Sequence, residues 1–339
     1  MKQGDVLHGY DIVTKPTNDN AGKCVWAFAV RDGREYFIKE FLDPKRPRPG
    51  GMGDENSKRL RLAHCEEFEE RHWSVINRID PTDREAGNLV TATDFFCEGT
   101  KYYKVTARLH PVVPPAPQEL SARQKVVLLG TLGHSLALLH RLDIVHGDLK
   151  PQNVLLHRPS GSDLYTAKLI DFDDAYVSGR PPSPDLIGGD LFYAAPELVR
   201  YLLERAPPGE LTVAADMFAF GLMTHGYLTG VLPGFDRTHH SAAEAIGAGA
   251  SILLDRRLSR PVAALIRAML AVNPAHRPKA SEALTVLAEE STVELVIPPA
   301  ARLRGSLTGG GTARPVTPAP LPLPPGRRSR LRINLDDRR

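Results

Sequence analysis

The sequence predicts an α+β fold of two lobes with a cleft between them, followed by a disordered tail. Residues up to about 106 are rich in strand patterns, whereas residues from about 110 to 297 carry apolar positions at helical spacing. From residue 298 onward the composition changes to proline and arginine. Because small ligands usually bind between lobes, the cleft is the expected functional site.

The strand-rich region contains a series of apolar or alternating stretches bounded by turn residues. They are YDIV from Tyr10, CVWAFAV from Cys24, REYFIKEF from Arg34, NLVTATDFF from Asn88 and KYYKVT from Lys101, the last two joined by a turn at Glu98-Gly99. One predicted helix, over residues 59–79, interrupts these strands, because Phe68, Trp73 and Ile79 recur near helical spacing.

The second region is predicted to be helical throughout. Its periodic segments are VVLLGTLGHSLALLHRL, PELVRYLLERA, ADMFAFGLMTHGYL, PVAALIRAML and ASEALTVLAEE. The longest apolar stretch runs from Val126 to Val145 and is interrupted by His134, His140 and Arg141. It is therefore interpreted as a buried helix of the larger lobe, and no membrane span is expected.

Composition favours a reduced, cytoplasmic protein. The cysteines, Cys24, Cys65 and Cys97, are odd in number and widely spaced, which excludes a disulfide framework or a cysteine metal site. Met1 is followed by a polar start without the apolar core of a signal peptide.

The tail, residues 298–339, contains eight prolines, no aromatic residue, and nine arginines against two aspartates. Such a segment buries too little apolar surface to fold alone. Its TPAPLPLPP stretch favours an extended conformation that proline-binding grooves recognise, and its closing arginines suit an acidic partner. A merely solvated tail is the alternative, and no nucleic-acid partner is expected.

The stretch IVHGDLKPQNVLL places Asp148, Lys150 and Asn153 in a short loop between two apolar runs. A hydroxyl that is to be phosphorylated needs a carboxylate to orient it, and the departing phosphoryl group needs a cation beside it. Downstream, KLID ends an apolar run in Asp171, and a carboxylate at a strand end suits Mg²⁺ that bridges phosphate oxygens. Together these side chains predict phosphoryl transfer.

With these motifs the chain resembles the eukaryotic-type (Hanks-type) serine/threonine protein kinases, from about residue 10 to about 297. Further matches are Ala195-Pro196-Glu197, Asp216 and Gly221 in ADMFAFG, Arg277 as the ion-pair partner of Glu197, and Lys39 in YFIKEF. The resemblance implies one catalytic domain over residues 1–297 and a protein substrate with serine or threonine. The bias toward alanine, arginine and proline resembles proteins of GC-rich bacteria.

The resemblance also implies the role of each site residue, with ATP and Mg²⁺ as cofactors. Asp148 would orient the acceptor hydroxyl, Lys150 would neutralise the γ-phosphoryl group, and Asn153 and Asp171 would hold Mg²⁺. Lys39 would hold the α and β phosphates and pair with a helix glutamate. Four glutamates crowd that helix, and Glu69 is the choice among Glu66, Glu67, Glu69 and Glu70.

The nucleotide pocket follows from the same resemblance. Thr106 would lie at the back of the adenine pocket, with Ala107 to Leu109 as the hinge. Gly22 and Val25 would belong to the phosphate-binding loop, of which Gly22 is the only glycine. Phe37 stands where a small residue usually covers the adenine, so either the pocket is altered or the alignment slips by one residue.

Other departures concern the catalytic segment. Asp173 replaces a glycine after Asp171, and Asp190 stands where a threonine is usual. Gly147 replaces an arginine that commonly binds an activation-loop phosphate. We therefore expect that residues 171–197 need no phosphorylation to become ordered, and that activity is constitutive or set by a partner.

Two alternatives to a protein kinase remain open. A pseudokinase or scaffold is suggested by the glycine-poor loop and Phe37, although Lys39, Asp148, Asn153 and Asp171 are all retained. A small-molecule kinase would share the fold, because fold alone does not settle the substrate. The LKP sequence after Asp148 and the Ala-Pro-Glu motif favour a protein kinase over the aminoglycoside type.

Overall fold

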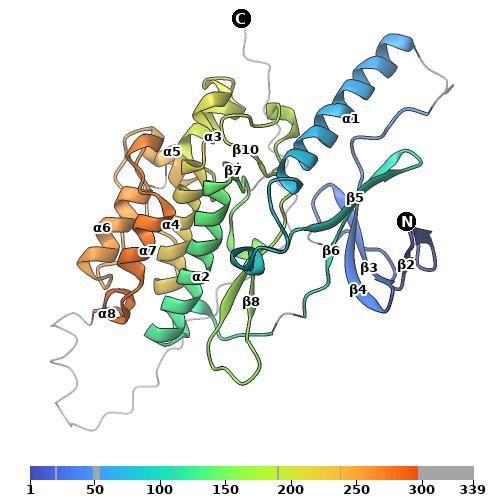
Figure 1. The fold of residues 1–339 in the computed structure, drawn as a ribbon. Helices are drawn as coiled ribbons and strands as arrows, with labels where there is room; N and C mark the ends of the chain where they lie inside the picture. The colour runs from blue at the N-terminus through green and yellow to red at the C-terminus, as the bar shows by residue number, and fades with distance from the viewer. Residues whose placement is uncertain (20, 49–53, 111, 189–190, 237, 297–339) are drawn as a thin grey trace, which may run out of the picture.

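The computed structural model describes residues 1–19, 21–48, 54–110, 112–188, 191–236 and 238–296. Within them, a sheet and one long helix form an N-terminal lobe, and most of the helices gather in a larger C-terminal lobe (Figure 1). The predicted α+β fold with a strand-rich and a helical lobe is confirmed. The predicted tail and Asp190 lie outside the described residues.

The N-terminal sheet has six antiparallel strands in the order β1-β2-β3-β4-β6-β5. The strands are β1 (Val6–Leu7), β2 (Tyr10–Ile12), β3 (Cys24–Arg31), β4 (Arg34–Phe41), β5 (Ala92–Glu98) and β6 (Lys101–Ala107). Each strand predicted for this sheet is present, although β5 begins at Ala92 and not at Asn88. Within the sheet, the two-residue β1 was not predicted, because so short a strand has no alternation to recognise.

Side-chain alternation gives the sheet two different faces. One face buries Ala27, Ala29 and Ile38 completely, in a cluster with Tyr10 and Ile12. The opposite face therefore carries the intervening residues of β3 and β4. The alternation fixes which residues of each strand can reach the second lobe.

Helix α1 (Glu55–Ile76) lies beside this sheet (Figure 1). Its four buried residues, Cys65, Phe68, His72 and Val75, follow helical spacing, and Phe68 packs against Phe41 and Phe95. The helix begins four residues earlier than predicted, because the Asp54 carboxylate accepts the Ser57 N–H at 3.0 Å as an N-cap.

The C-terminal lobe is built on two central helices. Leu132 and Leu136 of α2 and Phe218 and Phe220 of α4 are fully buried in one core. At Gly221, a Cβ would lie 2.9 Å from the Met269 Cβ, so glycine allows α4 to approach α6 closely. The helices are α2 (Ala122–Arg141), α3 (Pro196–Leu202), α4 (Ala214–Thr229), α5 (Ala242–Gly247), α6 (Arg260–Met269), α7 (Ala280–Leu287) and α8 (Glu290–Val293).

Two small antiparallel sheets lie between the large sheet and these helices (Figure 1). Strand β7 (Ile144–Val145) pairs with β10 (Tyr176–Val177), and β8 (Val154–His157) pairs with β9 (Thr166–Leu169). They fix both ends of the loop that carries Asp148 and of the segment that carries Asp171.

The long apolar stretch that was predicted to be a buried helix forms α2 and β7 of the C-terminal lobe. Among the described residues, none of the helices combines the length and the apolar character that crossing a bilayer requires. The short helix α5 was not predicted, because its six residues are too few for a clear periodicity.

Candidate active site

Asp216 of α4 holds the loop between β7 and β8 in place through hydrogen bonds to its backbone. The Asp216 carboxylate accepts the N–H groups of His146 at 2.8 Å and Gly147 at 3.2 Å. The ring of His146 is buried, and its Nε2 lies 3.0 Å from the carbonyl oxygen of Ile170. One buried carboxylate and one imidazole thus hold this loop and the segment that follows β9 together.

Asp148 lies within this loop between two of the predicted site residues. The Lys150 Nζ lies 2.6 Å from Asp148 Oδ2, and the Asn153 amide donates to the same oxygen at 3.0 Å and to the Asp148 carbonyl at 2.8 Å. The structure therefore brings Asp148, Lys150 and Asn153 together. Such contacts hold the Asp148 carboxylate in a defined orientation beside a cation.

Asp171 lies two residues after the end of β9 and has a positive φ of 63°, which turns the chain there. The Ile170 N–H donates to the Asn153 carbonyl at 2.9 Å, so both predicted metal ligands lie on paired segments. Because the Asn153 amide nitrogen is used by Asp148, its oxygen is the atom left for a cation.

The residues fit a magnesium ion. Asp171 and Asn153 offer oxygen ligands, which Mg²⁺ prefers, and it usually takes only one or two carboxylates and completes its shell with phosphates and water. No group of three or more His, Cys, Asp or Glu side chains is arranged to hold a metal among the described residues. Asp171 and Asn153 would supply only part of the shell of a magnesium ion.

Lys39 of β4 contacts the segment after β9 and so joins the N-terminal sheet to it. Its Nζ lies 2.8 Å from Asp171 Oδ1 and 2.6 Å from Asp173 Oδ2. Burial alone would lower the pKa of Lys39, but the two carboxylates outweigh this effect and raise it. The lysine is charged and is held where it faces the predicted metal ligand.

The prediction that Glu69 pairs with Lys39 is wrong for this structure. Glu69 Oε1 accepts from Arg46 Nη1 at 2.5 Å and from the Tyr102 hydroxyl. The buried face of α1 presents Phe68 and His72, so Glu69 is rotated toward the side of Arg46. The choice among the four glutamates depended on the rotation of the helix about its axis. The positions of the glutamates in the sequence do not define that rotation.

Two cationic residues near Lys39 were missed in the sequence. Lys104 of β6 is paired directly with Lys39 across the strands, and its Nζ lies 2.5 Å from Asp173 Oδ1. Arg71 of α1 donates to the Asp173 carbonyl at 2.6 Å. Strand alternation was the available signal for Lys104, since it lies two residues before Thr106 and therefore on the same face.

The strand register settles the question about Phe37 and corrects Val25. Phe37 is paired with Thr106, and Lys39 with Trp26, so these residues share the face toward the cleft. Val25 is paired with Glu40 and lies on the opposite face. The alignment of the phosphate loop was therefore shifted by one residue, and Trp26 takes the place expected for Val25.

The face of the sheet that carries Lys39 and Thr106 also carries a cluster of aromatic rings. The ring centroids of Trp26 and Phe37 are 5.3 Å apart, and those of Trp26 and Phe28 are 5.5 Å apart. The guanidinium of Arg108, in the predicted hinge of Ala107 to Leu109, lies 3.8 Å from the Phe28 ring centroid. Phe37 is thus part of an aromatic cluster of tilted and edge-to-face rings, where a small residue was expected.

The loop before β3 is held to this surface. The Trp26 indole N–H donates to the Asp19 carbonyl at 2.9 Å, and the loop turns at Gly22, whose φ is 56°. Cys24 is buried, and burial together with the Asp173 charge raises its pKa to about 12. This thiol is therefore not a reactive group.

The backbone geometry at residue 147 explains why a glycine, and not an arginine, precedes Asp148. Its φ is 79°, and a Cβ at this position would lie 2.3 Å from the Asp174 carbonyl oxygen. A side chain is thus excluded by both backbone strain and contact. The backbone of Asp174 occupies the space that the side chain of an arginine at position 147 would need.

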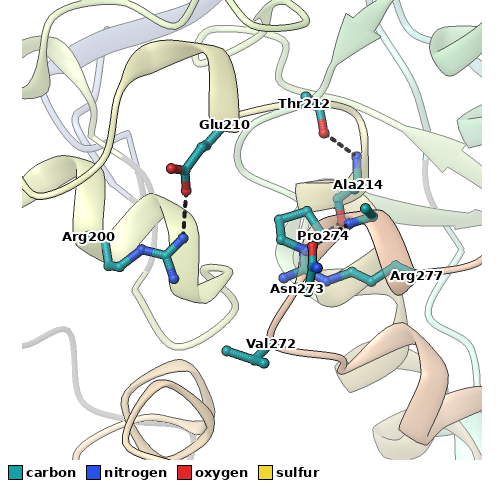
Figure 2. A pocket seen from close by; sticks show the side chains of 9 residues that line it. Arg200, Glu210, Thr212, Ala214, Val272, Asn273, Pro274 and Arg277 are labelled. Carbon is teal, nitrogen blue, oxygen red and sulfur yellow. Dashed lines mark hydrogen bonds and ion pairs between the residues drawn. The ribbon is translucent and has the colours of Figure 1, made fainter.

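A cavity of about 700 Å³ lies elsewhere, between α3, the start of α4 and the turn before Arg277 (Figure 2). Its polar groups are already paired, since Arg200 binds Glu210 at 2.6 Å and Arg277 binds the buried Glu197. None of its lining residues belongs to the predicted site, so we assign no chemistry to it. A much smaller cavity adjoins Asp148 and Tyr193.

Comparisons with known proteins agree with this geometry. Residues 84–286, more than half of the chain, match the family model of the protein kinase domain. The serine/threonine-protein kinase pkn2 of Myxococcus xanthus is 26% identical over 285 residues, which cover 82% of this chain and 32% of that protein. RAD53, a serine/threonine-protein kinase of Saccharomyces cerevisiae, is 32% identical over 155 residues, which cover 43% and 18%.

These relatives are distant and longer than the chain, which spans less than a third of either. The family match begins at Arg84 and therefore includes the catalytic loop and Asp171 but not Lys39. It agrees with the fold, in which an antiparallel sheet precedes a helical lobe. This chain belongs to the protein kinase domain family.

Proposed function

We propose that the protein is a Mg²⁺-dependent serine/threonine kinase that transfers the γ-phosphoryl group of ATP to hydroxyl groups of proteins. The observation that carries the proposal is the position of Asp148, held by Asn153 at 3.0 Å and by Lys150 at 2.6 Å. A carboxylate fixed beside a cation is what an acceptor hydroxyl and a departing phosphoryl group require.

Each residue contributes a distinct step. Asp148 accepts a hydrogen bond from the substrate hydroxyl, orients its oxygen toward the γ-phosphorus and takes its proton as the new bond forms. The bond from the γ-phosphorus to the bridging oxygen breaks at the same time, and ADP leaves. Lys150 stabilises the negative charge on the transferred group, and Lys39 binds the α and β phosphates. Asp171 and Asn153 would hold Mg²⁺, which would supply positive charge beside the phosphates.

The choice of a protein substrate rests on the relatives that carry serine/threonine-protein kinase names. The retained Asp148, Lys150, Asn153 and Asp171 argue against a pseudokinase, because a scaffold has no chemical need for this set. The aromatic surface of Trp26, Phe28 and Phe37 is the one observation that favours a different nucleotide pocket. Nucleotide binding must therefore be measured apart from transfer.

The test is transfer of labelled γ-phosphate from Mg²⁺-ATP to the protein itself and to a generic basic protein. Asp148→Asn should abolish transfer and keep nucleotide binding. Asp32→Asn, at an exposed turn between β3 and β4, is the matched control and should behave like the wild type.

Absence of transfer by the wild type, with ATP bound, would contradict the proposal for protein substrates. A peptide library beside a panel of small hydroxyl metabolites then separates a protein kinase from a small-molecule kinase. Transfer that survives Asp148→Asn would remove the assigned role of Asp148.

A further inference from the structure

We propose that Asp173 is the positioning residue for Lys39, in the place where a glutamate of α1 was expected; this inference rests on the proposed function. Asp173 lies in the loop between β9 and β10, two residues after Asp171. Its Oδ2 is 2.6 Å from the Lys39 Nζ, the shorter of the two carboxylate contacts that this lysine makes.

The lysine needs a carboxylate that is not committed to the metal. Asp171, its other partner, is assigned to Mg²⁺, and an oxygen that ligates a cation binds an ammonium group less strongly. Asp173 has no such assignment. It can therefore stay with Lys39 when a nucleotide is bound.

Asp173 is itself rigidly held. Its second oxygen, Oδ1, contacts the Lys104 Nζ at 2.5 Å, and its backbone carbonyl accepts from Arg71 at 2.6 Å. The Lys104 side chain is only 7% exposed. A carboxylate fixed by strand β6 and by helix α1 can define the position of a flexible lysine on β4, because few rotamers satisfy all these contacts.

Helix α1 offers no carboxylate at this position. The residues of its buried face are Cys65, Phe68, His72 and Val75, and burial followed by the charges of Lys104 and Arg71 lowers the pKa of His72, so the ring is neutral. Glu69 is bound by Arg46, and Glu67 accepts from Ser183 at 3.1 Å. Glu66 and Glu70 are exposed.

The charges around Asp173 balance only when its carboxylate is present. Lys39, Lys104 and Arg71 face Asp171, Asp173 and Asp174, so cations and carboxylates are equal in number. Without Asp173, the ammonium groups of Lys39 and Lys104, on directly paired residues, would lie side by side and repel each other.

A consequence concerns regulation. The phosphate-binding lysine is anchored to the loop between β9 and β10 and not to an acidic residue of α1. A displacement of α1 therefore does not by itself remove the partner of Lys39, whereas a displacement of residues 171–174 does. The loop, not the helix, is the element whose position controls the site.

The experiment compares binding of Mg²⁺-ATP and of adenosine, which lacks phosphates, to the full chain by calorimetry. Asp173→Asn should weaken Mg²⁺-ATP binding by about tenfold or more, as expected for a lost charge-assisted contact. Adenosine binding should be unchanged, because Lys39 acts on phosphates. Asp173→Glu, which keeps the charge, should recover part of the affinity, and Glu70→Gln is the matched control on α1.

The variants Lys104→Met and Lys104→Met/Asp173→Asn address folding and charge balance. The double variant removes both partners of a buried pair, so it should be as stable as Lys104→Met but as weak in Mg²⁺-ATP binding as Asp173→Asn. Full recovery of affinity in the double variant would mean that Asp173 only neutralises Lys104, and it would overturn the inference.

Other outcomes also decide the matter. Equal losses of Mg²⁺-ATP and adenosine binding in Asp173→Asn would assign a structural role and overturn the inference alone. A tenfold loss in Glu69→Gln with Asp173→Asn unaffected would return the role to α1. A wild type that binds no nucleotide would contradict the proposed function, and the inference with it.

Discussion

Arg277 forms two parallel hydrogen bonds with Glu197, 2.6 Å to Oε1 and 2.7 Å to Oε2, and both side chains are fully buried. The sequence predicted this pair across 80 residues. Arg277 also donates to the carbonyls of Ala214 and Ala271, so one guanidinium joins α3, the start of α4 and the end of α6. The guanidinium of Arg277 thus donates to a carboxylate and to two backbone carbonyls inside the lobe.

We predict that Arg277→Met lowers the free energy of unfolding by about 3–5 kcal/mol, because it leaves the Glu197 carboxylate buried without its partner. Chemical denaturation monitored by circular dichroism measures the change. The matched control is Arg200→Met, in an ion pair with Glu210 that is about 40% exposed on both sides, where at most about 1 kcal/mol is expected. Similar losses in the two variants would contradict the assignment.

Gly147→Ala should destabilise the catalytic loop by about 2 kcal/mol or more and reduce transfer strongly. The new Cβ would lie 2.3 Å from the Asp174 carbonyl oxygen at a φ of 79°. Gly161→Ala is the control, since its φ of 76° is similar but no atom lies within 4 Å. If both variants lose the same stability in thermal melting, backbone strain alone explains Gly147.

We expect the stability of the protein to depend on pH through the buried carboxyl group of Asp174. Burial, followed by the charge of Asp148, raises its pKa from 3.8 to about 6. The folded protein therefore holds this proton more tightly than the unfolded chain, whose pKa is 3.8. The stabilisation is fully present below pH 3.8 and is lost as the pH rises through about 6. Asp174→Asn, which stays neutral, should gain stability relative to the wild type between pH 4 and pH 7.

Denaturation curves at several pH values measure this difference. Asp185→Asn, at an exposed position of the same segment, controls for the loss of one negative charge. A difference between Asp174→Asn and the wild type that is constant with pH would contradict the raised pKa.

Trp26 should report nucleotide binding. The chain has two tryptophans, Trp26 on the cleft face and Trp73 on α1. In a Trp73→Phe background, Mg²⁺-ATP should quench the remaining fluorescence as the base approaches the indole ring. Trp26→Phe should be silent, and an unchanged spectrum in the presence of ATP bound by calorimetry would place the base elsewhere.

The segment before α3 should not require phosphorylation. Ser183 donates its hydroxyl to Glu67, and Pro182 accepts from the Tyr201 hydroxyl, so unmodified side chains hold this segment. We expect Ser178→Ala/Ser183→Ala to keep activity within about twofold, as is usual for surface changes. Ser183→Glu should instead lower it, because two carboxylates would meet. A large loss in the double alanine variant would defeat the hypothesis.

The sequence by itself predicted the elements whose signals are local. Asp148, Lys150 and Asn153 lie within six residues, so the chain between them already confines their side chains to one loop. The strands and α2 carry an apolar period, and α4 is buried on nearly all sides, and these patterns determined the two lobes. Glu197 and Arg277 were found because each lies in a short motif.

Only the tertiary structure decided how the two lobes meet at the site. Strand register places Trp26, not Val25, toward the cleft, and a shift of one residue moves a side chain to the other face. The rotation of α1 directs Arg71 to the loop, His72 to the aromatic rings of Phe41 and Phe95, and Glu69 to Arg46. Neighbouring polar residues on a helix look alike in sequence, because what separates them is a rotation of about 100° per residue that only packing fixes.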